Sequence, residues 1–290
     1  MEYTGWLIYS EQDANENKSY INWFIQEASK QGLNLKLILR EHLQIGIVNQ
    51  NQKILLNNSP VKQPTFAIVR TVEPLLNAHL EELGVEVFNS SSVSRLSNHK
   101  GITHMEVHKL NIPMVDTYFY KKEGIPFSSP IPFPFVVKEV TGRGGKQVFF
   151  IKDQLEWQNC QEKLTNEFLI QSSSNVQLGK DIRVFVVGKE IIGSVLRESN
   201  SDFRANYKLG GSAKWYELSL EEVAMISKII NHFDFGMVGI DFLVGEDGTL
   251  IFNEIEDVVG SRTLSAVSNK NILESYVTFI KNKLSGNFNT

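Results

Sequence analysis

Short apolar runs alternate with stretches of helical periodicity along the first part of the chain. Tyr20, Trp23 and Phe24 recur at helical spacing before Gly32, which is typical of a helix with a glycine stop. The other elements predicted here are strands at residues 5–9, 35–39, 66–69 and 85–88, a hairpin of 45–48 with 53–56, and a helix over about 74–83. This alternation predicts a small Rossmann-like α/β domain over residues 1–92. The first turn lacks Gly-x-Gly-x-x-Gly, so it gives no support for a bound dinucleotide.

The rest of the chain is richer in strands. Apolar β-type runs occupy residues 133–138, 147–151, 168–171, 181–187 and 191–196, with helical stretches over about 98–110 and 154–164. A further helix opens at the capping box Ser219 to Glu222, and an acidic hairpin over residues 237–256 follows it. We therefore expect two α+β units, over residues 93–170 and 171–290.

Three carboxylates gather on that last hairpin, namely Asp241, Glu254 and Glu256. If Val244 pairs with Thr249 across the loop, the two-residue period of the pleat puts all three on one face. Like charges at this spacing need a cation, and oxygen ligands suit Mg²⁺ better than zinc. The alternative is an exposed acidic strand end.

A glycine-rich segment joins two of the β-type runs. It consists of Thr141, Gly142, Arg143, Gly144, Gly145 and Lys146. Glycines let backbone N–H groups approach an anion and the two basic side chains add positive charge, so the segment is a candidate phosphate loop. Val140 and Gln147 stand where a Walker A motif has Gly and Ser or Thr, which excludes that motif. An ordinary glycine-rich turn is the alternative.

Basic side chains elsewhere are candidates for the same anion. Lys138 ends an apolar run, where a lysine is rare unless its ammonium meets an anion or reaches solvent. Lys100 opens a helical stretch and is less distinctive. A further cluster lies around two predicted strands and contains Asp181, Arg183, Arg197, Asp202, Arg204, Asn206, Gly210 and Gly211. Arginine suits a bidentate grip on carboxylate or phosphate, although a single arginine is more often part of a surface ion pair.

Two features favour ordinary structure over chemistry. His104 and His108 do not form His-Glu-x-x-His, so we interpret them as helix-surface residues and not as zinc ligands. Cys160 is the only cysteine, which excludes an intramolecular disulfide, and no Gly-x-Ser-x-Gly elbow is present.

Composition narrows the class of protein. With 290 residues, of which 42% are hydrophobic and 21% charged, the chain has enough apolar surface for two or three subdomains. The net charge of −4 and the scattered basic residues give no reason to expect nucleic acid or an anionic membrane as a partner. The start of the chain has no signal-peptide pattern and no stretch is apolar enough to span a membrane, so we expect a cytosolic protein.

Taken in order, these segments resemble the ATP-grasp superfamily, and within it the RimK-type glutamate ligases and the related LysX-type ligases. The segments are Lys100, residues 136–138, 141–145, 168–171, 181–183, 202–206 with 210–211, 239–241, and 253–256 with Gly260. The resemblance covers residues 97–282, and residues 1–92 resemble the small α/β domain that precedes the grasp in these enzymes.

The resemblance implies a two-subdomain ATP-grasp fold with ATP held between the subdomains. Lys100 and Lys138 would contact the nucleotide or its phosphates, and the 141–146 loop would close over the phosphates. The strand ending at Gln171 would meet adenine through its backbone, and Asp181 would also belong to the nucleotide site.

The same resemblance implies roles for the acids and arginines. Asp241, Glu254 and Glu256 would hold two Mg²⁺ ions, for which Mn²⁺ is a possible substitute. Arg183 and Arg204 match positions that face the γ-phosphate and the acyl substrate, and Asn206 matches a position near the same centre. The implied chemistry is formation of an acylphosphate, which an amine displaces to give an amide.

Departures from the family pattern leave the acceptor open. Glu256 stands where the family usually has Asn, and residues 172–174 are serines where an acidic residue commonly holds the ribose. Arg262 stands where the RimK pattern is acidic, so we expect Arg197, Gly260 and Arg262 to contact substrate. The acceptor amine belongs to a small molecule, a peptide or a protein, and the chain is a possible homo-oligomer.

The leading interpretation is an ATP-dependent carboxylate–amine ligase. One alternative keeps the nucleotide site in a regulatory or partner module that does not turn over. Another is an ATP-grasp kinase that phosphorylates a small molecule, because the same cradle can serve phosphoryl transfer to a hydroxyl.

Overall fold

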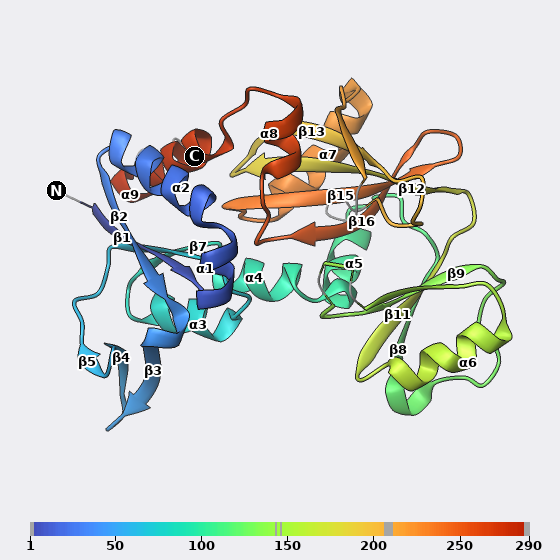
Figure 1. Ribbon diagram of the computed structural model, residues 1–290, viewed down its shortest axis with the longest axis horizontal. Coiled ribbons are helices and arrows are strands. Elements are labelled where there is room, and N and C mark those ends of the chain that lie inside the picture. Colours follow the sequence, from blue (N-terminus) through green and yellow to red (C-terminus); the bar gives the residue numbers. More distant parts are fainter. Residues whose placement is uncertain (1–2, 143, 146, 206–210, 287–290) are drawn as a thin grey trace.

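The sheet at the N-terminal end of the chain has four parallel strands in the order β2-β1-β6-β7 (Figure 1). The structure, a computed structural model, describes residues 3–142, 144–145, 147–205 and 211–286. The strands are β1 Tyr3–Tyr9, β2 Leu33–Leu39, β6 Phe66–Val69 and β7 Glu86–Phe88, and the helices around them are α1 Glu11–Glu16, α2 Lys18–Lys30 and α3 Pro74–Glu82. Parallel neighbours need crossover connections, which α2 and α3 supply. The Rossmann-like α/β order predicted from the sequence is confirmed.

The C-terminal helix α9 (Ile272–Ser285) packs on this N-terminal sheet and on α2. Phe24 of α2 is fully buried, and its ring centre lies 5.8 Å from that of Tyr276 of α9. The two ends of the chain therefore share one hydrophobic core. A small antiparallel sheet projects from the same region (Figure 1) and consists of β3 Leu43–Val48, β4 Asn51–Leu56 and β5 Ser59–Pro60, preceded by the turn η1 Arg40–His42.

A second sheet is antiparallel, with the order β10-β9-β11-β8. Its elements are β8 Thr117–Lys121, η2 Lys122–Gly124, β9 Phe135–Glu139, β10 Val148–Ile151, α6 Gln154–Lys163 and β11 Glu167–Ser172. Trp157 of α6 is fully buried and packs against Phe135 and Phe168 on one face of the sheet. The other face is turned toward the third sheet (Figure 1).

The third sheet is also antiparallel and has the order β14-β13-β12-β15-β16. Its strands are β12 Val176–Val187, β13 Glu190–Glu198, β14 Ser212–Trp215, β15 Met237–Gly245 and β16 Leu250–Glu256, and the associated helices are α4 Ser91–Ser97, α5 Lys100–His108, α7 Leu220–His232 and α8 Arg262–Val267. Val184 shares a core with Ile226 of α7 and Val107 of α5, so these helices cover one face. The odd-numbered positions of β12, beginning with Arg183, point to the opposite face.

The pairing of β15 with β16 differs from the predicted register. Val244 pairs with Leu250 and not with Thr249, because Thr249 belongs to the turn, where its backbone carbonyl accepts a hydrogen bond from the N–H of Gly245. A bulge then shifts the register by one residue, so that Asp241 pairs with Glu254. The two offsets add up to two residues, which is one period of the pleat, so the three acids share one face as expected.

Among the described residues, no helix is both long enough and apolar enough to cross a bilayer.

Candidate active site

A cavity of about 1090 Å³ lies where the second and third sheets meet and extends to α1 of the N-terminal part. The predicted site residues that line it are Lys100, Lys138, Thr141, Gly142, Gly144, Gly145, Gln171, Asp181, Arg183, Arg197, Arg204, Asp241, Glu254, Glu256, Gly260 and Arg262. The structure thus brings together segments that are separated by more than 150 positions in the sequence. Arg143, Lys146, Asn206 and Gly210 lie outside the described residues.

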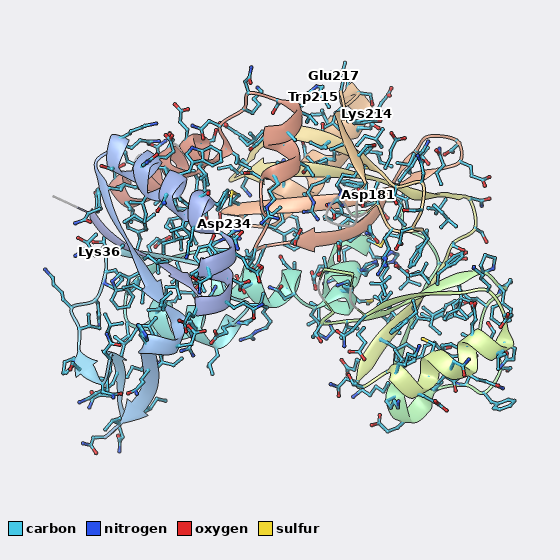
Figure 2. All side chains as sticks on the ribbon, viewed as in Figure 1. Lys36, Asp181, Lys214, Trp215, Glu217 and Asp234 are labelled. Carbon is cyan, nitrogen blue, oxygen red and sulfur yellow. The ribbon has the colours of Figure 1, made fainter. Side chains whose placement is uncertain are left out.

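Asp241 is at the centre of a buried charge network on β12, β13 and β15. Its side chain is 1% exposed and accepts two hydrogen bonds of 2.7 Å from Arg183 and one of 2.8 Å from Arg197. Arg197 also binds both carboxylate oxygens of Asp181. The guanidinium of Arg197 therefore binds two carboxylates. In Figure 2, Asp181 lies inside the molecule, whereas Lys214, Trp215 and Glu217 lie at its edge.

The pKa values of Asp181 and Asp241 are shifted in opposite directions. Burial opposes the charge of Asp241, but Arg183 and Arg197 together hold its pKa at about 2. Burial raises the pKa of Asp181 to about 6; Arg197 opposes this shift, and the charge of Asp241 adds to it. Of the pair, Asp241 is the one that stays ionised at every physiological pH.

The two glutamates of β16 are held by the basic residues across the cavity. Nη1 of Arg183 lies 2.6 Å from Oε2 of Glu256, but the two groups are poorly aligned and this oxygen accepts no hydrogen bond. Nζ of Lys100 lies 3.3 Å from Oε2 of Glu254. Burial opposes the charge of Glu254, but Lys100 and Lys138 lower its pKa. The ionised form of Glu254 is therefore favoured, and both glutamates line the cavity.

Cations already compensate the three acids, and the described residues contain no preformed cluster of three or more metal-ligating side chains. The acids nevertheless share one face, line one cavity and offer only oxygen donors, one of them without an aligned hydrogen bond. These properties fit Mg²⁺, which is bound through few carboxylates together with phosphate oxygens and water.

Two lysines line the cavity, and one of them contacts the glycine loop between β9 and β10. Lys100 begins α5, and its Nζ donates a 2.6 Å hydrogen bond to the carbonyl of Gly142. Lys138 is 9% exposed, and its Nζ donates a 2.6 Å hydrogen bond to Oδ1 of Asn253. Burial lowers the pKa of Lys138 to about 8, although Glu254 partly opposes this shift. No carboxylate lies within ion-pair distance of Lys138 among the described residues.

Asn253 was not among the predicted site residues. A bulge places it at the cavity, next to Glu254 in the chain, and bulges are not visible in an apolar pattern.

The glycine loop is a hairpin tip that contacts the third sheet. Gly144 and Gly145 have φ of +60° and +73°, a left-handed conformation that favours glycine. Nη1 of Arg204 donates a 2.7 Å hydrogen bond to the carbonyl of Gly145, while Asp202 binds the rest of the same guanidinium. Arg204 therefore ties the loop to the opposite wall of the cavity.

His104 is not a helix-surface residue, contrary to the prediction, because it is 3% exposed and packs under β11 and β16. Burial and nearby Lys138 lower its pKa to about 4, so the ring is neutral. Nδ1 lies 2.8 Å from the carbonyl of Lys100, which can only accept, so Nδ1 carries the proton. Nε2 is then an acceptor.

That tautomer fixes the side-chain amide of Gln171. Its Nε2 donates to Nε2 of His104 at 3.0 Å and to the hydroxyl of Thr117 at 3.1 Å. Its Oε1 is buried without a hydrogen-bond partner. A buried acceptor of this kind is costly unless a ligand donates to it. The strand that was expected to meet adenine thus carries an unsatisfied acceptor at the cavity.

Comparison with known proteins identifies the family. The model of the RimK-like ATP-grasp domain matches residues 99–280. The chain belongs to this family. The matched segment contains every predicted nucleotide, metal and arginine position, and it begins one residue before Lys100.

RimK-like and other ATP-grasp proteins of known structure share the fold of the whole chain. A RimK domain protein from Sphaerobacter thermophilus superimposes with a TM-score of 0.73 at 17% identity, covering 95% of this chain and 98% of the other. D-alanine–D-alanine ligase from Bacillus anthracis, complexed with ATP, gives a TM-score of 0.71 at 14% identity, with 98% of each chain covered. The expected ATP-grasp architecture is confirmed.

Curated relatives include ATP-grasp ligases. Human N-acetylaspartylglutamate synthase A is 27% identical over 252 residues, which is 81% of this chain and 64% of the relative. Glutamate–LysW ligase ArgX of Sulfolobus acidocaldarius is 25% identical over 269 residues, with 85% and 92% covered. Beta-citrylglutamate synthase B of Danio rerio is 28% identical over 213 residues, with 68% and 53% covered. The chain spans less than two thirds of the length of the vertebrate relatives.

Proposed function

We propose that this chain is an ATP-dependent carboxylate–amine ligase. In the first step, a carboxylate oxygen of the acid attacks the γ-phosphorus of ATP, ADP leaves, and an acylphosphate forms. In the second step, the amine nitrogen attacks the acyl carbon, phosphate leaves, and the nitrogen loses a proton as the amide forms. Such chemistry needs reactants held in line and compensation of the charge on the phosphoryl group.

One observation carries the proposal: a single cavity joins a glycine loop, a face of three acids held by arginines and Lys100, and a buried lysine that has no carboxylate within ion-pair distance among the described residues. Lys138 and Lys100 would bind phosphate oxygens, and the loop would cover them. Arg183 would turn from the acids toward the transferred phosphoryl group, with Arg204 and Asn206 beside it. The role of Asn206 is taken from the family match alone.

Asp241, Glu254 and Glu256 would hold Mg²⁺, with two ions as the proposed number and Mn²⁺ as a substitute. The metal would supply charge neutralisation at the phosphates. In support, an ATP-grasp ligase with the same fold, PsnB, has been solved with Mg and ADP. That likeness, at 13% identity and a TM-score of 0.69, supports the fold of the site and not the substrate.

Substrates are proposed from the named activities of the relatives. Glutamate appears in the names of the N-acetylaspartylglutamate, citrylglutamate and LysW ligases, so it is the first amino acid to test. We also propose three units with the boundaries 1–92, 93–170 and 171–290. In this division the N-terminal unit faces the substrate end of the cavity and the other two hold the nucleotide.

The test is turnover by the purified protein. Supplied with ATP, Mg²⁺ and a panel of carboxylic acids paired with L-glutamate or other amines, the protein should release ADP and phosphate in step with an amide detected by mass spectrometry. Lys138→Met should abolish ADP release, whereas Lys228→Met, an exposed change on α7 outside the cavity, should not. Release of AMP and pyrophosphate, or a phosphorylated product without an amide, would overturn the proposal.

A further inference from the structure

The cavity has a second end, away from the nucleotide, where the N-terminal sheet meets the segment between β16 and α8. Arg70 and Arg262 line the cavity, and so do Asp13 and Glu16 of α1. Arg70 follows β6 at the carboxyl edge of the parallel sheet, next to the end of β1. The chain moves from β1 to β2 on one side and β6 lies on the other, so this is the point where the strand order reverses. Ligands of open α/β sheets bind at such a point.

Arg70 is 7% exposed and lines the cavity. Its Nη2 donates a 2.7 Å hydrogen bond to the carbonyl of Val259, and its Nε lies 3.3 Å from the hydroxyl of Tyr9. The rings of Tyr9 and Tyr20 flank the guanidinium at 5.9 and 5.8 Å. Every one of these contacts is with a neutral group, and among the described residues no carboxylate lies within ion-pair distance of the buried charge of Arg70.

Most other cations that line the cavity, unlike Arg70, have a carboxylate partner. Lys100, Lys180, Arg183, Arg197 and Arg204 each have a carboxylate within 4.0 Å. Within the described part of the chain, the lining cations without one are Lys138, Arg70 and Arg262. Lys138 belongs to the nucleotide end, so two unneutralised guanidinium groups remain at the opposite end.

Arg70 and Arg262 flank the same short segment. Arg262 opens α8, is exposed, and reaches only the side-chain oxygen of Asn17 at 3.4 Å. Gly260 lies in the sequence between Val259, which Arg70 contacts, and Arg262. An added Cβ at Gly260 would meet no atom within 4 Å. There is consequently open space beside Gly260, on the segment that joins the contact of Arg70 to Arg262.

We infer that Arg70 and Arg262 form a carboxylate subsite, which binds a carboxylate of the amine substrate that the reaction does not consume. Arg70 has used Nε and one N–H of Nη2, and no partner of Nη1 is found in the described ranges, so the edge formed by Nη1 and Nη2 suits a planar carboxylate. The inference rests on the proposed ligase function. It assigns the N-terminal unit a direct part in substrate selection.

The experiment compares amino acids with their amides. L-glutamate is assayed beside L-glutamine and L-isoglutamine, each of which replaces one carboxylate by a neutral amide. Arg70→Gln and Arg262→Gln should raise KM for L-glutamate on the order of tenfold to a hundredfold, with kcat and KM for ATP nearly unchanged. The amide that lacks the recognised carboxylate should bind the wild type weakly and be insensitive to both substitutions. Arg95→Gln, an exposed change on α4, is the matched control and should change nothing.

A merely structural role of Arg70 predicts a different pattern. It would alter KM for L-glutamate and for both amides alike and lower the thermal midpoint, and equal effects on all three compounds would overturn the inference. If Arg70→Gln does not fold, Arg262→Gln decides, because this exposed side chain makes a single long hydrogen bond. Preference for O-phospho-L-serine over L-glutamate would also overturn it, since the subsite would then be for phosphate.

Calorimetry separates this inference from the proposed function. Protein loaded with Mg²⁺ and a non-hydrolysable ATP analogue is titrated with L-glutamate, L-aspartate and glycine. Binding that weakens about tenfold or more in Arg262→Gln supports the subsite even if no compound is ligated. Binding of none of the three to the wild type would overturn the subsite, whatever the turnover assay gives.

Discussion

Arg183 holds Asp241 by two parallel hydrogen bonds of 2.7 Å, from Nε to Oδ1 and from Nη2 to Oδ2. The two residues are directly opposite each other on β12 and β15. Asp241, which we propose as a metal ligand, is also the anchor of two buried arginines. Stability and chemistry are therefore coupled at this residue, and substitutions must be chosen to separate them.

Asp241→Asn should destabilise the metal-free protein by about 3–5 kcal/mol, because it leaves Arg183 and Arg197 buried without their shared anion. The measurement is urea unfolding in EDTA. Glu256→Gln is the control: the Glu256 side chain is 33% exposed and its contact with Arg183 is poorly aligned, so the loss should stay near 1 kcal/mol. Equal losses in the two variants would contradict this account.

Asp181 should make stability fall as pH rises. Its pKa is raised from 3.8 to about 6 in the folded protein, so its protonated form is favoured by folding. A raised pKa contributes stability that is complete below about pH 4 and lost as pH passes through about 6. The unfolding free energy of the wild type, relative to that of Asp181→Asn, should therefore decrease between pH 4 and 7. A difference that is flat or rises over this range would refute the assignment.

Glu254→Gln should raise the Mg²⁺ concentration needed for half-maximal turnover by about tenfold or more, because one negative oxygen donor is lost. Glu246→Gln removes the same charge from the exposed loop of the same hairpin and should leave the requirement unchanged. ADP release measured across a Mg²⁺ series at saturating ATP gives both numbers. An equal shift in the two variants would indicate general electrostatics and not ligation.

Much of the site could be predicted from the sequence because its residues stand at the ends of recognisable apolar runs. Lys138, Gln171 and Asp241 each lie on a strand that the apolar pattern located. The small helices α1, α4 and α8 and the strands β8 and β14 were not predicted. Each is short, and α1 and β8 have few buried side chains, so periodicity gives little signal.

What the sequence could not reveal are contacts that depend on register and on distant segments. Asn253 contacts Lys138 from a bulge in the pairing of β15 with β16, which the apolar pattern does not encode. The burial of His104 depends on β16, which lies about 150 residues later in the chain. The helical pattern around His104 therefore predicted a surface residue. Arg70 likewise meets Val259 only through the fold.

Lys138 should take up a proton when ATP binds. With its pKa lowered to about 8, a substantial fraction of this lysine is neutral at pH 8, and nearby phosphates would restore the charge. Calorimetry at pH 8 in buffers of different ionisation enthalpy measures the uptake. Lys138→Arg stays charged and should show no uptake from this position. The same proton count in both proteins would mean that the phosphates do not approach Lys138.

Gln171 should set the preference for ATP over GTP. His104 and Thr117 hold the amide nitrogen of Gln171, which lines the cavity, and Oε1 is left as a buried acceptor that would suit the amino group of adenine and repel the carbonyl of guanine. Gln171→Met should weaken ATP binding by about tenfold while affecting GTP little, because the variant loses the acceptor for the amino group of adenine.

His104→Phe removes the acceptor that orients the Gln171 amide. It should therefore reduce the discrimination between ATP and GTP by letting the amide flip. Gln161→Met, on α6 away from the cavity, is the control. Titration of each protein with fluorescent ATP and GTP analogues gives the affinities, and unchanged discrimination in Gln171→Met would place the base elsewhere.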